Sequence, residues 1–138
     1  MMNKNIEGKE EKKSIVMVDD NNDNEKLYNT LFIKSNYNFE FISSSLEFLQ
    51  KLNSNQFSNR TLIILDYNID ENYHGLDLLK KIREKKLNNK IVIFSSSASD
   101  ELKRFDFSEL LPVFYLDKLD YNGKKLINFC DSLLYDVK

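Results

Sequence analysis

The chain is poor in the residues that build most metal and redox centres. Its 138 residues include one cysteine, Cys130, and one histidine, His74. A single cysteine cannot form a disulfide within the chain, and it excludes multi-cysteine zinc and iron–sulfur sites. The single histidine likewise excludes a multi-histidine site. We therefore expect any metal ion to bind oxygen ligands.

Long apolar runs and an excess of charge of one sign are also missing. The longest aliphatic stretch is LIIL at 62–65, far shorter than the roughly 20 residues of a membrane span. The 20 basic and 22 acidic residues give a net charge of −2, so no overall basic surface attracts nucleic acid or anionic membranes. Residues 1–13 are charged and lack the apolar core of a signal peptide. We expect a disordered tail over 1–13, one domain over 14–138, and a cytoplasmic location.

Short apolar segments alternate with segments of helical periodicity. The spacing predicts strands at 14–18, 39–42, 61–65, 91–94 and 113–116, and helices at 22–35, 45–52, 75–86, 99–110 and 121–135. Strict alternation favours an α/β fold, with a doubly wound parallel sheet and helices on both faces. The segment 39–42 alternates polar and apolar residues, as an edge strand does, whereas the other four are continuous apolar runs.

Two of these helices have a leucine spacing that predicts their buried faces. In the first, Leu27 lies on the same face as Leu31 and Phe32, and in the second Leu46 shares a face with Leu49 and Leu52. We expect these faces to pack on the sheet. In the last helix Cys130 falls on the apolar face, which predicts an inert buried thiol.

Polar residues follow the predicted strands where they end. They are Asp19 and Asp20 after the first strand, Asp66 after the third, Ser95 after the fourth and Lys118 after the fifth. In doubly wound sheets ligands bind at the carboxyl ends of the strands. We therefore expect three carboxylates, a hydroxyl and an ammonium to share one edge of the sheet.

This combination of groups is suited to phosphoryl transfer. Clustered carboxylates repel one another unless a cation lies among them, and oxygen ligands favour Mg²⁺ over Ca²⁺ or Zn²⁺. A carboxylate beside Mg²⁺ and a lysine can attack phosphorus, because both cations neutralise charge on the transferred group. The Ser95 hydroxyl can donate a hydrogen bond to a phosphoryl oxygen. Taken alone, however, Asp20 or Asn22 is equally well explained as the cap of the first helix.

Five segments resemble the receiver domain of two-component response regulators, including the chemotaxis regulators. They are VMVDD (16–20), LIILDYNI (62–69), GLDLLKKIR (75–83), IVIFSSSAS (91–99) and FYLDK (114–118). The resemblance covers about residues 14 to 136. It implies a flavodoxin-like fold with strand order 2-1-3-4-5.

The resemblance also implies a role for each residue at the predicted edge. Asp66 would accept a phosphoryl group from a histidine kinase or a histidine phosphotransfer protein. Asp20 would bind Mg²⁺ directly and Asp19 through water, while Asp66 and the backbone carbonyl of Asn68 complete the ligand set. The only chemistry expected is Mg²⁺-dependent self-phosphorylation and self-dephosphorylation of Asp66, not turnover of an external substrate.

The remaining implied roles concern switching. Ser95 would move toward the phosphoryl group, Lys118 would pair with its oxygens, and Tyr115 would change rotamer. The signal would pass to a downstream effector protein. The helix at 99–110, the strand after it and the last helix would form the partner or dimer surface. Direct binding to nucleic acid or a membrane is not expected, and the chain is either a whole regulator or a fragment of a larger one.

The sequence departs from the family at two places. Leu119 stands where the family has a proline after the active-site lysine, and a trans peptide there is expected to displace Lys118. The loop at 67–74 lacks the usual proline, has His74 before Gly75 and is longer by one residue. These departures motivate an alternative: a degenerate pseudo-receiver that binds partners independently of phosphorylation.

Two further classes are less well supported. An aspartyl phosphatase places a second Asp two residues after the nucleophile, where this chain has Asn68. A flavodoxin-like cofactor binder requires a Gly- or Ser/Thr-rich phosphate loop after the first strand, and this chain lacks one.

Overall fold

Five parallel strands form a single sheet in the computed structural model, which describes residues 12–96 and 100–135. Their order is β2-β1-β3-β4-β5, so both the predicted topology and the edge position of the second strand are confirmed. The predicted tail lies, apart from residues 12 and 13, outside the described residues. The strands are β1 (Ser14–Val18), β2 (Asn38–Ile42), β3 (Leu62–Asp66), β4 (Ile91–Ser95) and β5 (Val113–Asp117).

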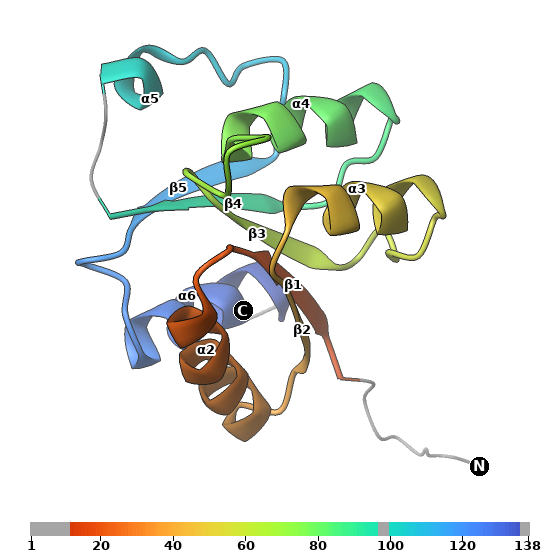
Figure 1. Ribbon diagram of the computed structural model, residues 1–138. Helices are drawn as coiled ribbons and strands as arrows, with labels where there is room; N and C mark the ends of the chain where they lie inside the picture. Colours follow the sequence, from red (N-terminus) through yellow and green to blue (C-terminus); the bar gives the residue numbers. More distant parts are fainter. Residues whose placement is uncertain (1–11, 97–99, 136–138) are drawn as a thin grey trace.

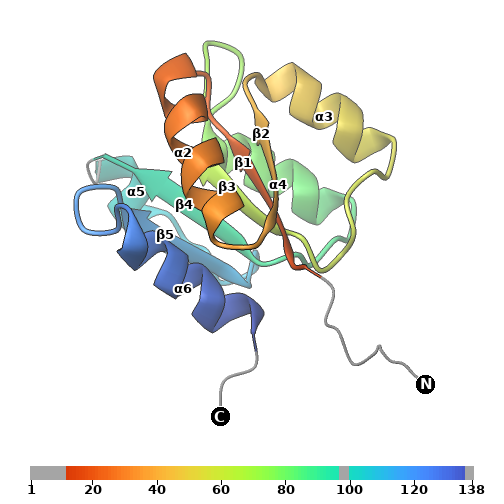
Figure 2. The ribbon, with the colours of Figure 1, turned by 90° about the horizontal axis from the view of Figure 1, so that it is seen from below.

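Helices cover both faces of the sheet (Figure 1). Two of them, α2 and α6, lie on one face, and the other three lie on the opposite face; Figure 2 shows α2 and α6 side by side in front of the strands. The helices are α2 (Asn22–Lys34), α3 (Ser45–Asn53), α4 (Gly75–Glu84), α5 (Asp100–Arg104) and α6 (Lys124–Leu134). No helix among the described residues is long and apolar enough to cross a membrane.

Alternation along the central strands creates two cores. On β3, Ile63 and Leu65 pack with residues of α3 and α4. Leu62 and Ile64 point to the other face and pack with residues of α2 and α6. All four side chains are fully buried, and burial of each contributes about 1.5–3 kcal/mol. This double burial explains why β3 is a continuous apolar run and why its position is fixed.

The caps of two helices are set by polar side chains just before them. The Asn21 side chain accepts a hydrogen bond from the backbone N–H of Asp23 at 2.9 Å, so Asn21 caps α2, rather than Asp20 or Asn22. Ser44 caps α3 by accepting from the N–H of Glu47 at 2.9 Å. Asp20 is thereby left exposed at the end of β1.

The predicted buried faces of α2 and α3 are partly wrong. Leu27 is 58% exposed and Leu46 is 57% exposed. Phe32 and Leu52 are buried as predicted, but the rings of Tyr28 on α2 and Phe48 on α3 enter the core in place of Leu27 and Leu46. Rings bury more apolar area than leucine side chains do, so the buried stripe follows the aromatic residues.

The helix predicted at 99–110 is also too long, because α5 ends at Arg104. The following segment is irregular, and Phe105 and Phe107 pack against the core from it. Arg83 of α4 holds the end of this irregular segment by donating to the carbonyl oxygens of Leu110 at 2.6 Å and Pro112 at 2.8 Å. Tertiary contacts thus replace helical hydrogen bonds in the approach to β5.

Candidate functional site

The carboxyl ends of the strands meet at one edge of the sheet. Val18 of β1 is in register with Leu65 of β3, so the next residues, Asp19 and Asp66, lie at neighbouring positions. Asp66 is in register with Phe94 of β4, which brings Ser95 to the same edge. The sheet topology therefore brings together residues that are far apart in the sequence.

Lys118 lies between two of the carboxylates. Its Nζ is 2.8 Å from Asp66 Oδ1 and 3.9 Å from Asp19 Oδ2. Its backbone N–H donates to the carbonyl oxygen of Ser95 at 2.7 Å, and its ammonium lies 5.6 Å from the centre of the Phe94 ring. Strand β4 therefore holds the backbone of Lys118 while its side chain reaches across to β3.

The expected displacement of Lys118 by Leu119 does not occur. Among the described residues the single cis peptide is Leu111–Pro112, so the Lys118–Leu119 bond is trans. Lys118 nevertheless contacts Asp66. Its backbone is held by its own N–H bond to the Ser95 carbonyl oxygen, before the chain reaches Leu119. Leu119 itself is 76% exposed.

Asp66 is held in an environment that resists its ionisation. Burial raises its pKa to about 6, with Asp19 and Asp20 adding repulsion, while the hydrogen bond from Lys118 acts in the opposite direction. The side chain is only 13% exposed. A positive charge added near Asp66 would therefore strongly stabilise its ionised form.

Asp19 is the most enclosed of the three acids, at 3% exposure. Its Oδ1 accepts from the backbone N–H of Asn21 at 3.0 Å and its Oδ2 from the Asn24 side chain at 2.8 Å. Asn24 therefore orients Asp19, a role that the sequence did not reveal, because it depends on how the first turn of α2 faces the end of β1.

The acidic groups suit Mg²⁺ in chemistry, but in this structure a lysine bridges them. Carboxylate and carbonyl oxygens are the ligands that Mg²⁺ takes, and Asp19, Asp20 and Asp66 supply them at this edge. Among the described residues no three acidic, cysteine or histidine side chains converge closely enough to hold an ion together. The ammonium of Lys118 supplies a positive charge that Asp66 and Asp19 share.

The loop after Asp66 is fixed by Asp70. Its carboxylate accepts from the backbone N–H and the hydroxyl of Ser45 at 2.8 and 2.9 Å, and from the N–H groups of Asn72 and Tyr73 at 3.0 and 3.2 Å. Burial works against ionisation, but these hydrogen bonds prevail and lower the pKa of Asp70. The loop that carries Asn68 is thus tied to the first turn of α3 without the family's proline.

Gly75 allows this loop to return close to Asp66. Its N–H donates to the carbonyl oxygen of Tyr67 at 2.9 Å. A Cβ atom at this position would lie 2.5 Å from the carbonyl oxygen of Asp66, well inside van der Waals contact. Only glycine fits here without moving the backbone of Asp66. His74, directly before it, begins α4 as its N-cap residue, with its N–H bonded to Asp77 at 3.0 Å.

The two predicted switch residues lie on neighbouring strands. Ser95 ends β4 and is 3% exposed, and Tyr115 on β5 is 38% exposed. Ser95 is in register with Asp117, two positions after Tyr115, so both side chains point to the same face of the sheet. Partial burial and the charges of Asp117 and Asp120 raise the pKa of Tyr115.

A tyrosine connects the phosphoacceptor loop to α5. Tyr67 directly follows Asp66 and is 7% exposed, and its hydroxyl donates a short hydrogen bond to Glu101. Glu101 belongs to the helix after the Ser95 segment. No role for Tyr67 could be predicted from the sequence, because its hydrogen-bond partner lies 34 positions away.

The fold and the acidic edge together define a parallel α/β protein with a candidate aspartyl site at the carboxyl ends of its strands. Residues 15–110 match the response regulator receiver domain family. The chain therefore belongs to that family. No curated protein matches it significantly.

Solved structures agree with this fold. The chemotaxis protein CheY4 from Vibrio cholerae superposes with a TM-score of 0.74 at 20% identity, over 90% of this chain and 100% of that one. A CheY-like receiver domain from Methanospirillum hungatei gives 0.75 at 23% identity, over 90% and 94%. The response regulator TrrA from Thermotoga maritima, solved in complex with Mg²⁺ and BeF, gives 0.69 at 24% identity, over 88% and 99%.

Proposed function

We propose that this receiver domain accepts a phosphoryl group on Asp66 and thereby changes its affinity for a partner protein. The observation that carries the proposal is the 2.8 Å contact between Lys118 Nζ and Asp66 Oδ1, which places a cation beside the carboxylate at the carboxyl edge of a receiver fold. The proposal includes a cytoplasmic location and a phosphohistidine donor on a kinase or phosphotransfer protein.

In the proposed reaction an Asp66 oxygen forms a bond to phosphorus while the phosphorus–nitrogen bond of the donor breaks. The imidazole nitrogen leaves with the bonding electron pair. Mg²⁺, held by Asp19, Asp20, Asp66 and the Asn68 carbonyl, would neutralise charge on the phosphoryl oxygens. Lys118 would supply a second positive charge beside Asp66, and the hydroxyl of Ser95 would donate to a phosphoryl oxygen.

The same groups would release the phosphoryl group to water, so the domain acts on itself and turns over no external substrate. Partner binding would follow from movement of Ser95 and Tyr115. The surface formed by α5, β5 and α6 is the proposed contact for an effector or a second copy. Leu119 and Tyr115 expose apolar area there, with 76% and 38% of their surfaces accessible.

Incubation with Mg²⁺ and acetyl phosphate tests the phosphoacceptor directly. We expect an acid-labile phosphoryl adduct on the wild-type chain by intact mass spectrometry. The adduct should be absent from Asp66→Asn and present in Asp106→Asn, a matched change of an exposed aspartate. An undiminished adduct on Asp66→Asn, or no adduct on the wild type, contradicts the proposal.

A second candidate is the pseudo-receiver, which binds its partner whether or not Asp66 is phosphorylated. The departures from the family at Leu119 and in the loop at 67–74 favour it, because they directly follow Lys118 and Asp66. This candidate predicts partner affinity that is unchanged by Asp66→Ala, by Mg²⁺ and by acetyl phosphate. A phosphorylation-dependent change in affinity would rule it out.

A further inference from the structure

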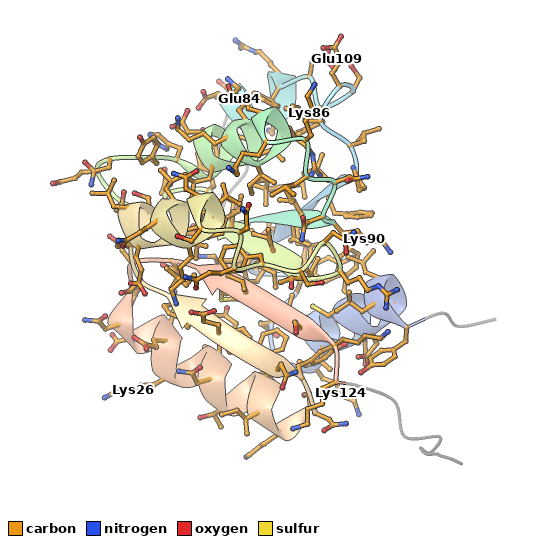
Figure 3. All side chains as sticks on the ribbon, turned by 90° about the vertical axis from the view of Figure 1, so that its right-hand side faces the viewer. Lys26, Glu84, Lys86, Lys90, Glu109 and Lys124 are labelled. Atoms are coloured by element: carbon orange, nitrogen blue, oxygen red, sulfur yellow. The ribbon has the colours of Figure 1, made fainter. Side chains whose placement is uncertain are left out.

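The opposite edge of the sheet, where the strands begin, carries two adjoining hollows with basic linings. The first has a volume of about 390 Å³ and is lined by Lys12, Lys13 and Arg60 together with Ser14 and Thr61. The second, of about 250 Å³, shares Lys13 and Arg60 and adds Lys90. Figure 3 views the molecule from this side, with Lys90 well separated from Glu84 and Glu109.

Among the described residues, no carboxylate lines these hollows. Four basic residues line them, Lys12, Lys13, Arg60 and Lys90. Within residues 12–96 and 100–135 none of the four forms an ion pair with a carboxylate. The chain as a whole has a net charge of −2, so this concentration of cations runs against its composition.

Neutral groups hold two of the four side chains in place. Lys90 Nζ donates to the carbonyl oxygen of Leu133 at 2.6 Å, and Lys13 Nζ lies 5.5 Å from the centre of the Tyr135 ring. Both contacts position an ammonium without cancelling its charge. Each ammonium has three N–H donors, so donors remain for a ligand.

A buried side chain, Asn89, holds the loop that carries Arg60. Asn89 is 1% exposed, and its amide nitrogen donates to the carbonyl oxygens of Ser58 and Thr61, both at 2.8 Å. The Ser58 hydroxyl in turn accepts from the Arg60 N–H at 3.0 Å. The backbone around Arg60 is therefore held before any ligand arrives, which lowers the entropy cost of binding.

We propose that these hollows form a binding site for a small ligand with two or more linked phosphate groups. Four cations spread over two connected hollows match an extended polyanion better than a single phosphate. Lysine, arginine and hydroxyl groups are the donors that phosphate oxygens use. The site is concave and local, which favours a small oligophosphate over a nucleic-acid strand, whose binding needs a longer basic track. The proposal does not rest on phosphorylation of Asp66, which lies at the other edge.

Titration with inorganic tripolyphosphate, followed by amide chemical shifts in a ¹⁵N-labelled sample, tests the site. The buffer contains EDTA and a constant ionic strength, so that chelation of Mg²⁺ plays no part. We expect saturable shifts at the amides of Lys13, Ser14, Arg60 and Lys90. Sulfate at the same ionic strength should give much weaker shifts.

Charge variants locate the site. Replacing Lys13 and Arg60 together by glutamine should raise the dissociation constant for tripolyphosphate at least about tenfold, since each removes a charge-assisted contact. The matched control replaces Lys26 and Lys103, two exposed lysines on α2 and α5, and should change the constant less than about twofold.

Four results would overturn the proposal. They are equal binding of sulfate, equal weakening by both double variants, shifts confined to the Asp66 and Lys118 edge, and tighter binding of a short single-stranded RNA than of tripolyphosphate. Circular dichroism of both double variants verifies that they fold, so that loss of binding reports the loss of the two cations.

Discussion

The same topology builds both edges of the sheet, but the two edges differ in the sign, burial and pairing of their charged side chains. At the carboxyl edge, acids from β1 and β3 converge, are partly buried, and share one ammonium from the end of β5. At the amino edge, four cations from three separate segments surround open hollows and are not paired with carboxylates among the described residues. The first edge concentrates opposing charges at short distance, and the second displays one sign of charge to solvent.

This difference determines what each edge can do. Desolvation at the carboxyl edge raises the pKa of Asp66, so that edge responds strongly to a change in local charge, as a phosphoryl switch requires. The cations of the amino edge are exposed and stay hydrated, so they pay no comparable desolvation penalty. They suit reversible, salt-sensitive binding of an anion. The following predictions separate the two edges, beginning with the largest effect.

Neutralising Asp66 should stabilise the protein at neutral and higher pH. The folded-state pKa of about 6 lies above the ordinary 3.8, so ionised Asp66 opposes folding above about pH 6, by about 2 to 3 kcal/mol. That penalty disappears as the pH falls from about 6 to about 4. In EDTA, urea unfolding should therefore show Asp66→Asn more stable than wild type at about pH 8, with the difference shrinking below about pH 6. A difference that is independent of pH would contradict the assigned environment of Asp66.

Removing the ammonium at the carboxyl edge should slow phosphorylation. Lys118→Gln leaves a polar side chain without the charge that faces Asp66, and we expect the rate with acetyl phosphate to fall about 100-fold, the typical effect of losing one transition-state donor. The matched change at the other edge, Lys90→Gln, should leave the rate unchanged. Equal rates for Lys118→Gln and wild type would contradict the proposed role of Lys118 in phosphoryl transfer.

The sequence predicted the carboxyl edge better than the contacts that support it. Asp66 was identified because a carboxylate directly after four aliphatic residues marks a strand end, and strand ends meet in a parallel sheet. Neither the Asn24 bond to Asp19 nor the Tyr67 bond to Glu101 was predicted, since each depends on how a helix faces the sheet. The predicted length of α5 was wrong because Phe105 and Phe107 pack against the core from an irregular segment, where they do not continue the helix.

The basic hollows of the amino edge were also invisible in the sequence. Net charge suggested no anion site, because it averages over the whole chain. Lys13, Arg60 and Lys90 are dispersed along the sequence, and each alone is explained as a solvated surface residue. Only the order of the strands and the loop held by Asn89 bring them together.

Enlarging Gly75 should damage the carboxyl edge by steric overlap. The added methyl group of Gly75→Ala meets the Asp66 carbonyl oxygen, and the resulting shift should cost about 1 to 3 kcal/mol in the free energy of unfolding. Phosphorylation should slow as well, because the backbone of Asp66 moves. Gly123→Ala is the control: Gly123 has a φ of 54° with no atom near its Cβ position, so the strained backbone should cost about 1 to 3 kcal/mol without slowing phosphorylation. Equal phosphorylation rates in the two variants would show that Gly75 matters for folding alone.

The smallest effect compares two tyrosine–carboxylate bonds, one at each edge. Tyr67 at the carboxyl edge donates to Glu101 of α5, and Tyr37 at the amino edge donates to Asp131 of α6. Each Tyr→Phe change should cost about 1 kcal/mol. Only Tyr67→Phe should speed amide hydrogen exchange in α5, because that helix has five residues and short elements open locally before the whole domain unfolds. Unchanged exchange in Tyr67→Phe would mean that the packing of Leu102 holds α5 rather than the tyrosine bond. Equally fast exchange of α5 in Tyr37→Phe would mean that the effect is global destabilisation and is not specific to Tyr67. The expected result would show that Tyr67 connects the carboxyl edge to α5, whereas the Tyr37 bond connects the amino edge to α6.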